Sequence, residues 1–75
     1  MKVTLKLAGG FVHTVGFSLK ELDLEPGATI EDILGLIAID RAWPMIIARN
    51  GHGAQPHEVV ADGDRILVSP IFSGG

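Results

Sequence analysis

The 75-residue sequence contains no cysteine and no tyrosine, and it has one tryptophan and three phenylalanines. The lack of cysteine excludes disulfide bonds, thiolate metal sites and cysteine-ligated iron–sulfur clusters. A small domain of this kind must therefore be stabilised by its apolar core. A cysteine-free chain fits a reducing compartment, and we expect a cytoplasmic protein. Any sulfur chemistry must use sulfur that another molecule supplies.

Basic residues are also few. The chain has six Lys and Arg residues against nine Asp and Glu residues, for a net charge of −3. Nucleic-acid binders usually carry a basic patch, so we expect no nucleic-acid partner. No apolar run approaches the roughly 20 residues that span a bilayer, and the start MKVTLKLAGG lacks the apolar core of a signal peptide. We expect one soluble domain with no membrane partner.

Hydrophobic residues are abundant, at 47% of the chain. Residues 2–7 (KVTLKL) alternate between apolar and polar side chains, which predicts a half-buried strand, and the following AGG suits a turn. A second strand region is predicted from about Val12 to Leu24. Its apolar residues change from odd to even positions, so we expect a break near Lys20–Glu21.

The segment EPGATIEDILGLIAID, residues 25–40, predicts a helix. Thr29 is the expected N-cap, and the helix should end by about Asp40 because Pro44 prevents its continuation. Gly35 lowers helix propensity, and we expect it to permit close packing against the sheet. The apolar spacing typical of a buried helix face involves Ile30, Ile33, Leu34, Ile37 and Ala38.

Two further strands are predicted at residues 45–51 and 65–71, separated by a loop that ends in the turn-forming pair Asp62–Gly63. This order indicates an α+β roll in which a mixed sheet of four to five strands packs on one main helix. The first and last strands are both apolar enough to lie side by side and parallel at the centre. That arrangement is the β-grasp, or ubiquitin-like, fold.

Few side chains suggest a conventional active site. The three histidines, His13, His52 and His57, lack metal-ligand spacing, and we expect solvated surface histidines and no metal site. Asp62 and Asp64 are best explained by the turn between them. We expect Trp43 to be a partly buried packing residue.

The distinctive feature is the segment PIFSGG, which ends in Gly74 and Gly75. A terminal carboxyl has a pKa of about 3.3–3.7, so it is an anion at neutral pH and needs no general base to attack the α-phosphate of ATP. Two residues without Cβ atoms can enter a narrow channel and approach catalytic groups closely. We therefore predict that the Gly75 carboxylate is the reactive group and that no side chain is.

The sequence ADGDRILVSPIFSGG resembles the carboxyl-terminal signature of the ThiS/MoaD family of ubiquitin-like sulfur carriers. The resemblance implies that a ubiquitin-activating-type adenylyltransferase uses ATP and Mg²⁺ to adenylate Gly75, that a sulfur donor converts it to a thiocarboxylate, and that an acceptor synthase receives the sulfur. Gly74, Ser73 and Phe72 would be recognised as the tail. The chain itself would be a carrier with no permanently bound cofactor, and not an enzyme.

Within this interpretation, residues 1–71 are the β-grasp domain and residues 72–75 a flexible tail. Three alternatives stay open: a protein modifier joined through Gly75 to lysines, a permanent small subunit of molybdopterin synthase, and a β-grasp interaction module. The sequence does not choose among molybdopterin, thiamine, thiolated tRNA and cysteine as the destination of the sulfur.

Overall fold

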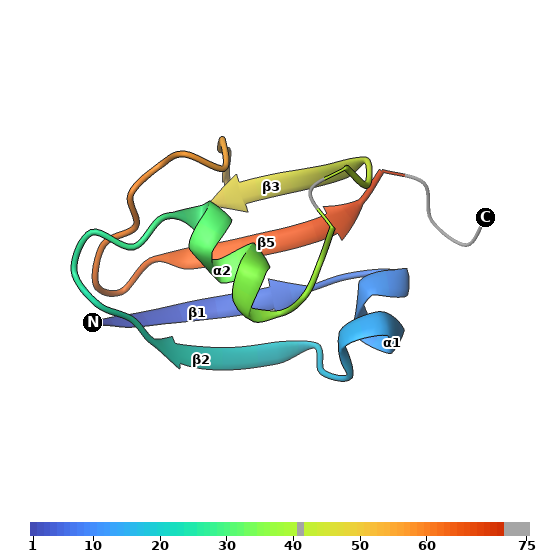
Figure 1. Cartoon of the computed structure of the whole chain (residues 1–75), viewed down its shortest axis with the longest axis horizontal. Coiled ribbons are helices and arrows are strands. Elements are labelled where there is room, and N and C mark those ends of the chain that lie inside the picture. Colours follow the sequence, from blue (N-terminus) through green and yellow to red (C-terminus); the bar gives the residue numbers. More distant parts are fainter. Residues whose placement is uncertain (41, 72–75) are drawn as a thin grey trace.

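The computed structural model describes residues 1–40 and 42–71, which form a five-stranded sheet and two short helices (Figure 1). Among these residues, no helix has the length and apolar character needed to cross a membrane. The elements in chain order are β1 (Lys2–Leu7), α1 (Gly10–Val15), β2 (Leu19–Asp23), α2 (Ile30–Leu36), β3 (Met45–Arg49), β4 (His52–Gly53) and β5 (Arg65–Pro70).

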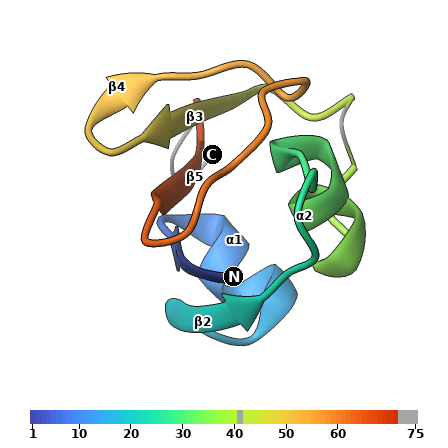
Figure 2. The same cartoon turned by 90° about the vertical axis from the view of Figure 1, so that its left-hand side faces the viewer.

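The sheet has the strand order β2-β1-β5-β3-β4. The first and last strands are central neighbours and run parallel, with Leu5 beside Ile66, while β1–β2, β3–β5 and β3–β4 are antiparallel. Figure 2 shows α2 lying against one face of the curved sheet. The predicted β-grasp arrangement is therefore confirmed, including the parallel central pair.

The core lies between α2 and the sheet. The alternation of β1 buries Val3, Leu5 and Leu7, and β5 contributes Ile66 and Val68 to the same layer. From α2, the buried face is formed by Ile30, Ile33 and Leu34. Burial of these aliphatic side chains supplies the main stabilisation of a domain that has no disulfide.

The predicted start of α2 is confirmed. Thr29 is the N-cap: its hydroxyl accepts from the Asp32 N–H at 3.2 Å, and the Asp32 carboxylate accepts from the Thr29 N–H at 2.9 Å. This capping box satisfies two backbone donors that the helix itself leaves free. The helix ends at Leu36, earlier than predicted, and Ala38 adopts a positive φ of 58°.

The prediction for Gly35 is wrong. A Cβ on this residue would meet nothing within 4 Å, so Gly35 lies on the solvent side of α2 and does not permit a close approach to the sheet.

The prediction of a strand from Val12 is also wrong. Residues Gly10–Val15 form α1, whose end is marked by Gly16 in the left-handed region at φ 102°. Phe11 is the buried residue of α1 and joins the core. Tertiary packing of this ring thus overrides the weak helix propensity of a segment with two valines and a threonine.

No break occurs at Lys20–Glu21, since β2 is continuous from Leu19 to Asp23. The apolar residues move from odd to even positions because they do not all face the core. Leu19 faces solvent, with 63% of its surface exposed, whereas Leu24 beyond the strand is buried. An edge strand tolerates this pattern because only part of it contacts the core.

Candidate functional site

The residues that the sequence predicts as the reactive tail, Phe72, Ser73, Gly74 and Gly75, lie outside the described residues. The proposed boundary between domain and tail after Ile71 is therefore still a prediction. The structure does describe the support from which this tail leaves, together with the surfaces around it.

The tail is attached to a central strand. Ala8 donates to the Val68 carbonyl at 3.1 Å on one side of β5, and Ile71 donates to the Pro44 carbonyl at 3.3 Å on the other. Figure 1 shows β5 running between β1 and β3 to its end near residue 71. The last described residue of the chain, Ile71, is therefore held by Pro44, the residue that precedes β3.

A close contact lies at the same end of β5. Gly9 has φ 59° and ψ −143°, and a Cβ at this position would lie 3.0 Å from Pro70 Cγ. Only glycine populates this backbone region readily, and only glycine leaves room for the proline ring. The glycine before α1 thereby fixes where the chain leaves the sheet.

The opposite end of β5 is anchored by Asp64, which is 7% exposed. Its carboxylate accepts from Arg49 Nε at 2.8 Å, from Asn50 Nδ2 at 2.9 Å and from the Ala61 N–H at 2.8 Å. Asn50 also bonds to both backbone groups of Arg65, through its own N–H and its side-chain oxygen. This network joins the end of β3 to the start of β5 and fixes their register.

Burial alone raises the pKa of the Asp64 carboxyl. Hydrogen bonds from Asn50 and Ala61, together with the Arg49 guanidinium, outweigh this effect and hold the pKa below its ordinary value. The carboxylate is thus charged and satisfied at neutral pH, which is typical of a structural anion.

The predicted turn before β5 is confirmed, with Gly63 at φ 87°. The turn is also hydrogen-bonded to β1. The backbone N–H of Gly63 donates to the Lys2 carbonyl at 2.7 Å, and the backbone N–H of Lys2 donates to Asp62 Oδ1 at 2.6 Å. The sequence reasoning explained Asp62 correctly but missed the role of Asp64, because its partners Arg49 and Asn50 are remote in the chain.

The face of the sheet turned away from α2 carries a row of side chains that crosses four strands. The register places Leu19 beside Lys6, Lys6 beside Leu67, and Leu67 beside Ala48. Ile46 lies on the same face, two residues from Ala48, and is 54% exposed. We call the six residues Leu19, Lys6, Leu67, Ala48, Ile46 and Arg65 the open-face patch.

The open-face patch combines an apolar centre with positive charge. Lys6 and Arg65 line a shallow cavity of about 390 Å³ together with Leu19, Ala48 and Leu67. No ion pair is recorded for Lys6 or Arg65 within the described part of the chain. An apolar surface with free cations suits a protein partner that presents apolar groups and carboxylates. The alternation of apolar and polar residues in β1 and β5 predicts which side chains of each strand share a face. Which of these side chains lie next to each other depends on the register between the strands, and the alternation does not give this register.

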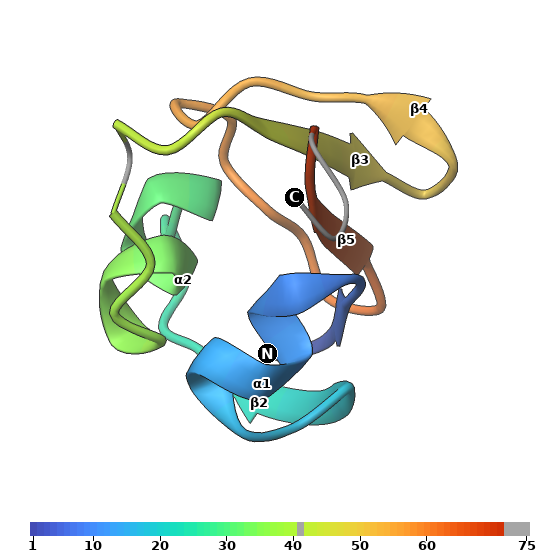
Figure 3. The same cartoon turned by 90° about the vertical axis from the view of Figure 1, so that its right-hand side faces the viewer.

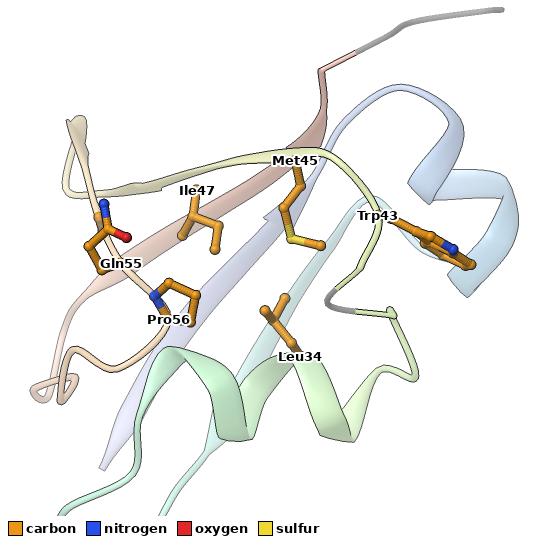
Figure 4. Close-up of a pocket in the computed structure, with 7 residues that line it drawn as sticks. Leu34, Trp43, Met45, Ile47, Gln55 and Pro56 are labelled. Carbon is orange, nitrogen blue, oxygen red and sulfur yellow. The ribbon is translucent and has the colours of Figure 1, made fainter.

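A second cavity, of about 270 Å³, lies on the helix side between α2 and β3 (Figure 4). Leu34 and Met45 point toward one another there, and Pro56 and Gln55 close one side. Trp43 stacks on Phe11 with ring centroids 6.0 Å apart, which confirms the predicted packing contact, but the residue is 41% exposed and so is less buried than predicted. Among the described residues, those that line this cavity carry no titratable side chain, and they contact one another through packing.

The histidines are exposed, as predicted. His52 places Nδ1 3.1 Å from the carbonyl oxygen of Asn50, a local contact in the β3–β4 turn. Over residues 1–40 and 42–71, no group of three or more metal-ligating side chains comes together.

Comparison with known proteins found no matching family model and no matching curated relative, but solved structures match closely. SAMP1 from Haloferax volcanii superimposes with a TM-score of 0.80 at 24% identity, covering 100% of both chains. Molybdopterin converting factor subunit 1, as assigned in Pyrococcus furiosus, gives a TM-score of 0.80 at 26% identity and covers 93% of this chain and 97% of its own. The chain has the ubiquitin-like β-grasp fold.

A third match comes from a complex of subunits 1 and 2 of the molybdopterin-converting factor of Helicobacter pylori. Its TM-score is 0.65 at 20% identity, with both chains covered over 100% of their length. The structural neighbours thus include molybdopterin converting factor subunit 1 and a small archaeal modifier protein, and they are consistent with the ThiS/MoaD family that the sequence resembles.

Proposed function

We propose that this chain is a ubiquitin-like sulfur carrier whose Gly75 carboxylate is adenylated by a ubiquitin-activating-type enzyme and then converted to a thiocarboxylate. The observation that carries the proposal is the position of β5. This strand leads to the Gly-Gly segment, lies at the centre of the sheet and contributes Leu67 and Arg65 to the open-face patch. A partner that docks on this patch would thus contact the strand that presents the tail.

The first step would be attack of a Gly75 carboxylate oxygen on the α-phosphorus of ATP. A new P–O bond forms, the bond to the β-phosphate breaks, and pyrophosphate leaves with Mg²⁺. In the second step, hydrosulfide attacks the acyl carbon, the acyl–phosphate C–O bond breaks, and AMP leaves. The thiocarboxylic acid then loses its proton to become the thiocarboxylate, so neither step requires an oxidant or a reductant.

The chain would supply the substrate group and its recognition, while the partner would supply the catalytic residues. Gly74 would allow the tail to enter a narrow channel, and Ser73 and Phe72 would be contacts within it. Lys6 and Arg65 on the open-face patch would face carboxylates of the activating enzyme and favour the correct docking orientation.

The neighbours support a ubiquitin-like sulfur carrier or modifier as the broader class, and a modifier is the second candidate. The full-length match to SAMP1, of a group named small archaeal modifier proteins, favours it. In this case the same adenylate would pass to the amine of a target lysine. The matches to subunit 1 of molybdopterin converting factor favour the carrier role, with a synthase subunit as the acceptor partner.

The test is intact mass spectrometry of the purified chain after incubation with its cognate activating enzyme, Mg-ATP and sulfide. The carrier predicts that one oxygen is replaced by sulfur, with fragment ions placing the change at Gly75. Omitting ATP is the matched control. An unchanged mass with an active cognate enzyme would contradict both candidates.

The same reaction in cell extract separates the two candidates. Lysine-linked adducts of high mass would favour the modifier; because Arg65 is the last basic residue, trypsin would leave ILVSPIFSGG, residues 66–75, on the target lysine. A thiocarboxylate that is consumed without such adducts would favour the carrier.

A further inference from the structure

The edge strand β2 has an unpaired side along its whole length within the described part of the chain. Met1 and Leu24 exchange backbone hydrogen bonds, and the Leu7 N–H donates to the Ser18 carbonyl. These bonds show which residue pairs of the β1–β2 ladder are hydrogen-bonded. Bonded and non-bonded pairs alternate in an antiparallel ladder. The residues whose backbone N–H and C=O groups therefore point away from β1 are Leu19, Glu21 and Asp23.

An apolar groove of about 480 Å³ runs beside this edge. Leu22 of β2 forms one wall, Leu36 and Ile37 at the end of α2 form the other, and Val15 and Phe17 lie before β2. Leu36 is 66% exposed, so its apolar side chain at this wall of the groove is open to a partner. In Figure 3, α1 lies in front, with β2 below it and α2 to its left.

Among the described residues that line the groove, Lys20 is the single charged one. Its Nζ lies 5.4 Å from the centre of the Phe17 ring, and no ion pair is recorded for it among residues 1–40 and 42–71. A cation held over an aromatic ring at the wall of an apolar groove can accept a carboxylate partner.

A second copy of this chain is a poor occupant of the edge. Symmetric antiparallel pairing of β2 with itself would place Glu21 directly opposite Glu21. Moving the register by one step places Lys20 opposite Lys20 or Glu21 opposite Asp23, and like charges in these positions are destabilising. The charge pattern thus opposes self-association but not the addition of a strand with a different sequence.

We propose that the free edge of β2 and its groove bind an extended segment of a partner protein, which adds to the sheet as a further strand. Apolar side chains at alternate positions of this segment fill the groove, an acidic side chain faces Lys20, and the intervening residues are polar. Backbone hydrogen bonds to Leu19, Glu21 and Asp23 provide affinity, and the groove provides specificity.

This site is separate from the tail chemistry. The groove shares no side chain with the open-face patch, and β2 is separated from β5 by the whole width of β1. The two surfaces meet only at Leu19, whose backbone belongs to the free edge and whose side chain belongs to the open-face patch. A partner bound at β2 therefore leaves the patch residues of β1, β3 and β5 accessible, so that one partner can hold the protein while another acts on its tail.

The test is an NMR titration of ¹⁵N-labelled protein with a short synthetic peptide. Valine alternates with threonine in this peptide, and one aspartate occupies the next valine position, so that its side chain lies on the same face as the valines. The amides of Leu19, Glu21 and Asp23 should shift and exchange with solvent more slowly. A control peptide of the same composition, with its valines adjacent, should shift them little, because its side chains no longer fall on one face.

A matched pair of variants tests strand addition itself. In Glu21→Pro the outward N–H is replaced by a ring, which an edge strand accepts without loss of a bond to β1. We expect affinity for the peptide to fall about tenfold, whereas Glu21→Thr, which retains the N–H, should bind like the wild type. If Glu21→Pro does not fold, methylation of a central peptide amide tests the same hydrogen bond on the wild-type protein.

Charge reversal tests the acidic position. Lys20→Glu should weaken binding of the aspartate peptide about threefold and strengthen binding of the matching lysine peptide. The proposal is overturned if saturating peptide leaves the β2 amides unchanged, or if the shifts map instead to the residues of the open-face patch on β1, β3 and β5. Equal binding by Glu21→Pro and Glu21→Thr would also overturn it, and so would β2 shifts that depend on protein concentration without peptide.

Discussion

Gly9 and Pro70 pack against each other where the last strand of the sheet ends, and a Cβ on Gly9 would lie 3.0 Å from Pro70 Cγ. The two residues come from opposite ends of the chain. Because Gly9 also has φ 59°, the contact depends on glycine in two ways: no side chain can fit, and few other residues adopt this backbone conformation.

Gly9→Ala should therefore destabilise the fold by about 1–3 kcal/mol, the cost of a strained backbone plus movement of the proline ring. Thermal unfolding should show a fall in Tm of about 4–8 °C for each kcal/mol in a domain of this size. Gly35→Ala is the matched control, and its expected change in stability has the opposite sign. It meets no atom within 4 Å and removes a helix-breaking residue, so it should stabilise by up to about 1 kcal/mol. Equal Tm values for the two variants would contradict the contact.

Asp64→Asn should cost about 1–3 kcal/mol at pH 7, because a buried carboxylate loses its charge-assisted bond from Arg49. The fold lowers the pKa of Asp64 from the ordinary value of 3.8. The charged form therefore stabilises the fold fully above about pH 5, and this contribution is lost as the pH falls through 3.8 toward the folded-state pKa. Urea denaturation across this range should show a shallower pH dependence in the variant.

Asp23→Asn provides the control for the pH experiment. The charge of Lys2, with hydrogen bonds from Lys2 and the amino terminus, also lowers the pKa of Asp23, but this carboxylate is exposed on the surface. Solvent screens such pairs, so the substitution should leave the pH dependence close to that of the wild type. A larger effect than that of Asp64→Asn would place the acid sensitivity outside the buried network.

Ile46→Ser should reduce adenylation by the cognate activating enzyme while leaving Tm within a few degrees of the wild type. Removing an apolar side chain that a partner buries as an anchor costs about 1 kcal/mol or more of binding, so kcat/KM should fall about fivefold or more. Val59→Ser is the control, since Val59 is 53% exposed against 54% for Ile46 but lies outside the open-face patch. Pyrophosphate release measures the rate, and equal effects of both variants would show that the open-face patch is not the docking surface.

Deletion of Gly75 should abolish pyrophosphate release and thiocarboxylate formation. Stability should be almost unchanged, because the described core ends before this residue. Thermal unfolding and intact mass measure the two effects separately. A large fall in Tm would indicate a structural role for the tail instead of a chemical one.

Local patterns predicted the parts of the fold that depend on one element. The alternation of Val3, Leu5 and Leu7 is realised as a buried face of β1, and Thr29 caps α2 as expected. Both signals depend on periodicity or on a neighbouring residue, so they need no knowledge of distant contacts.

The errors occurred where tertiary contacts decide the structure. The helix α1 forms in a segment of low helix propensity because Phe11 finds a place in the core. Asp64 does belong to the predicted turn, in which its N–H donates to the Ala61 carbonyl, but its bonds to Arg49 and Asn50 come from another strand and were missed. The open-face patch likewise exists only once the register of four strands is known.

The parallel pairing of β1 with β5 has a consequence for biosynthesis. β1 is synthesised before β5, yet the two strands are central neighbours. The long-range pairing cannot form until β5 has been made, so folding is delayed until nearly all of the described core is available. A chain that has folded therefore already carries the strand from which, under the proposed function, the reactive carboxylate would be presented.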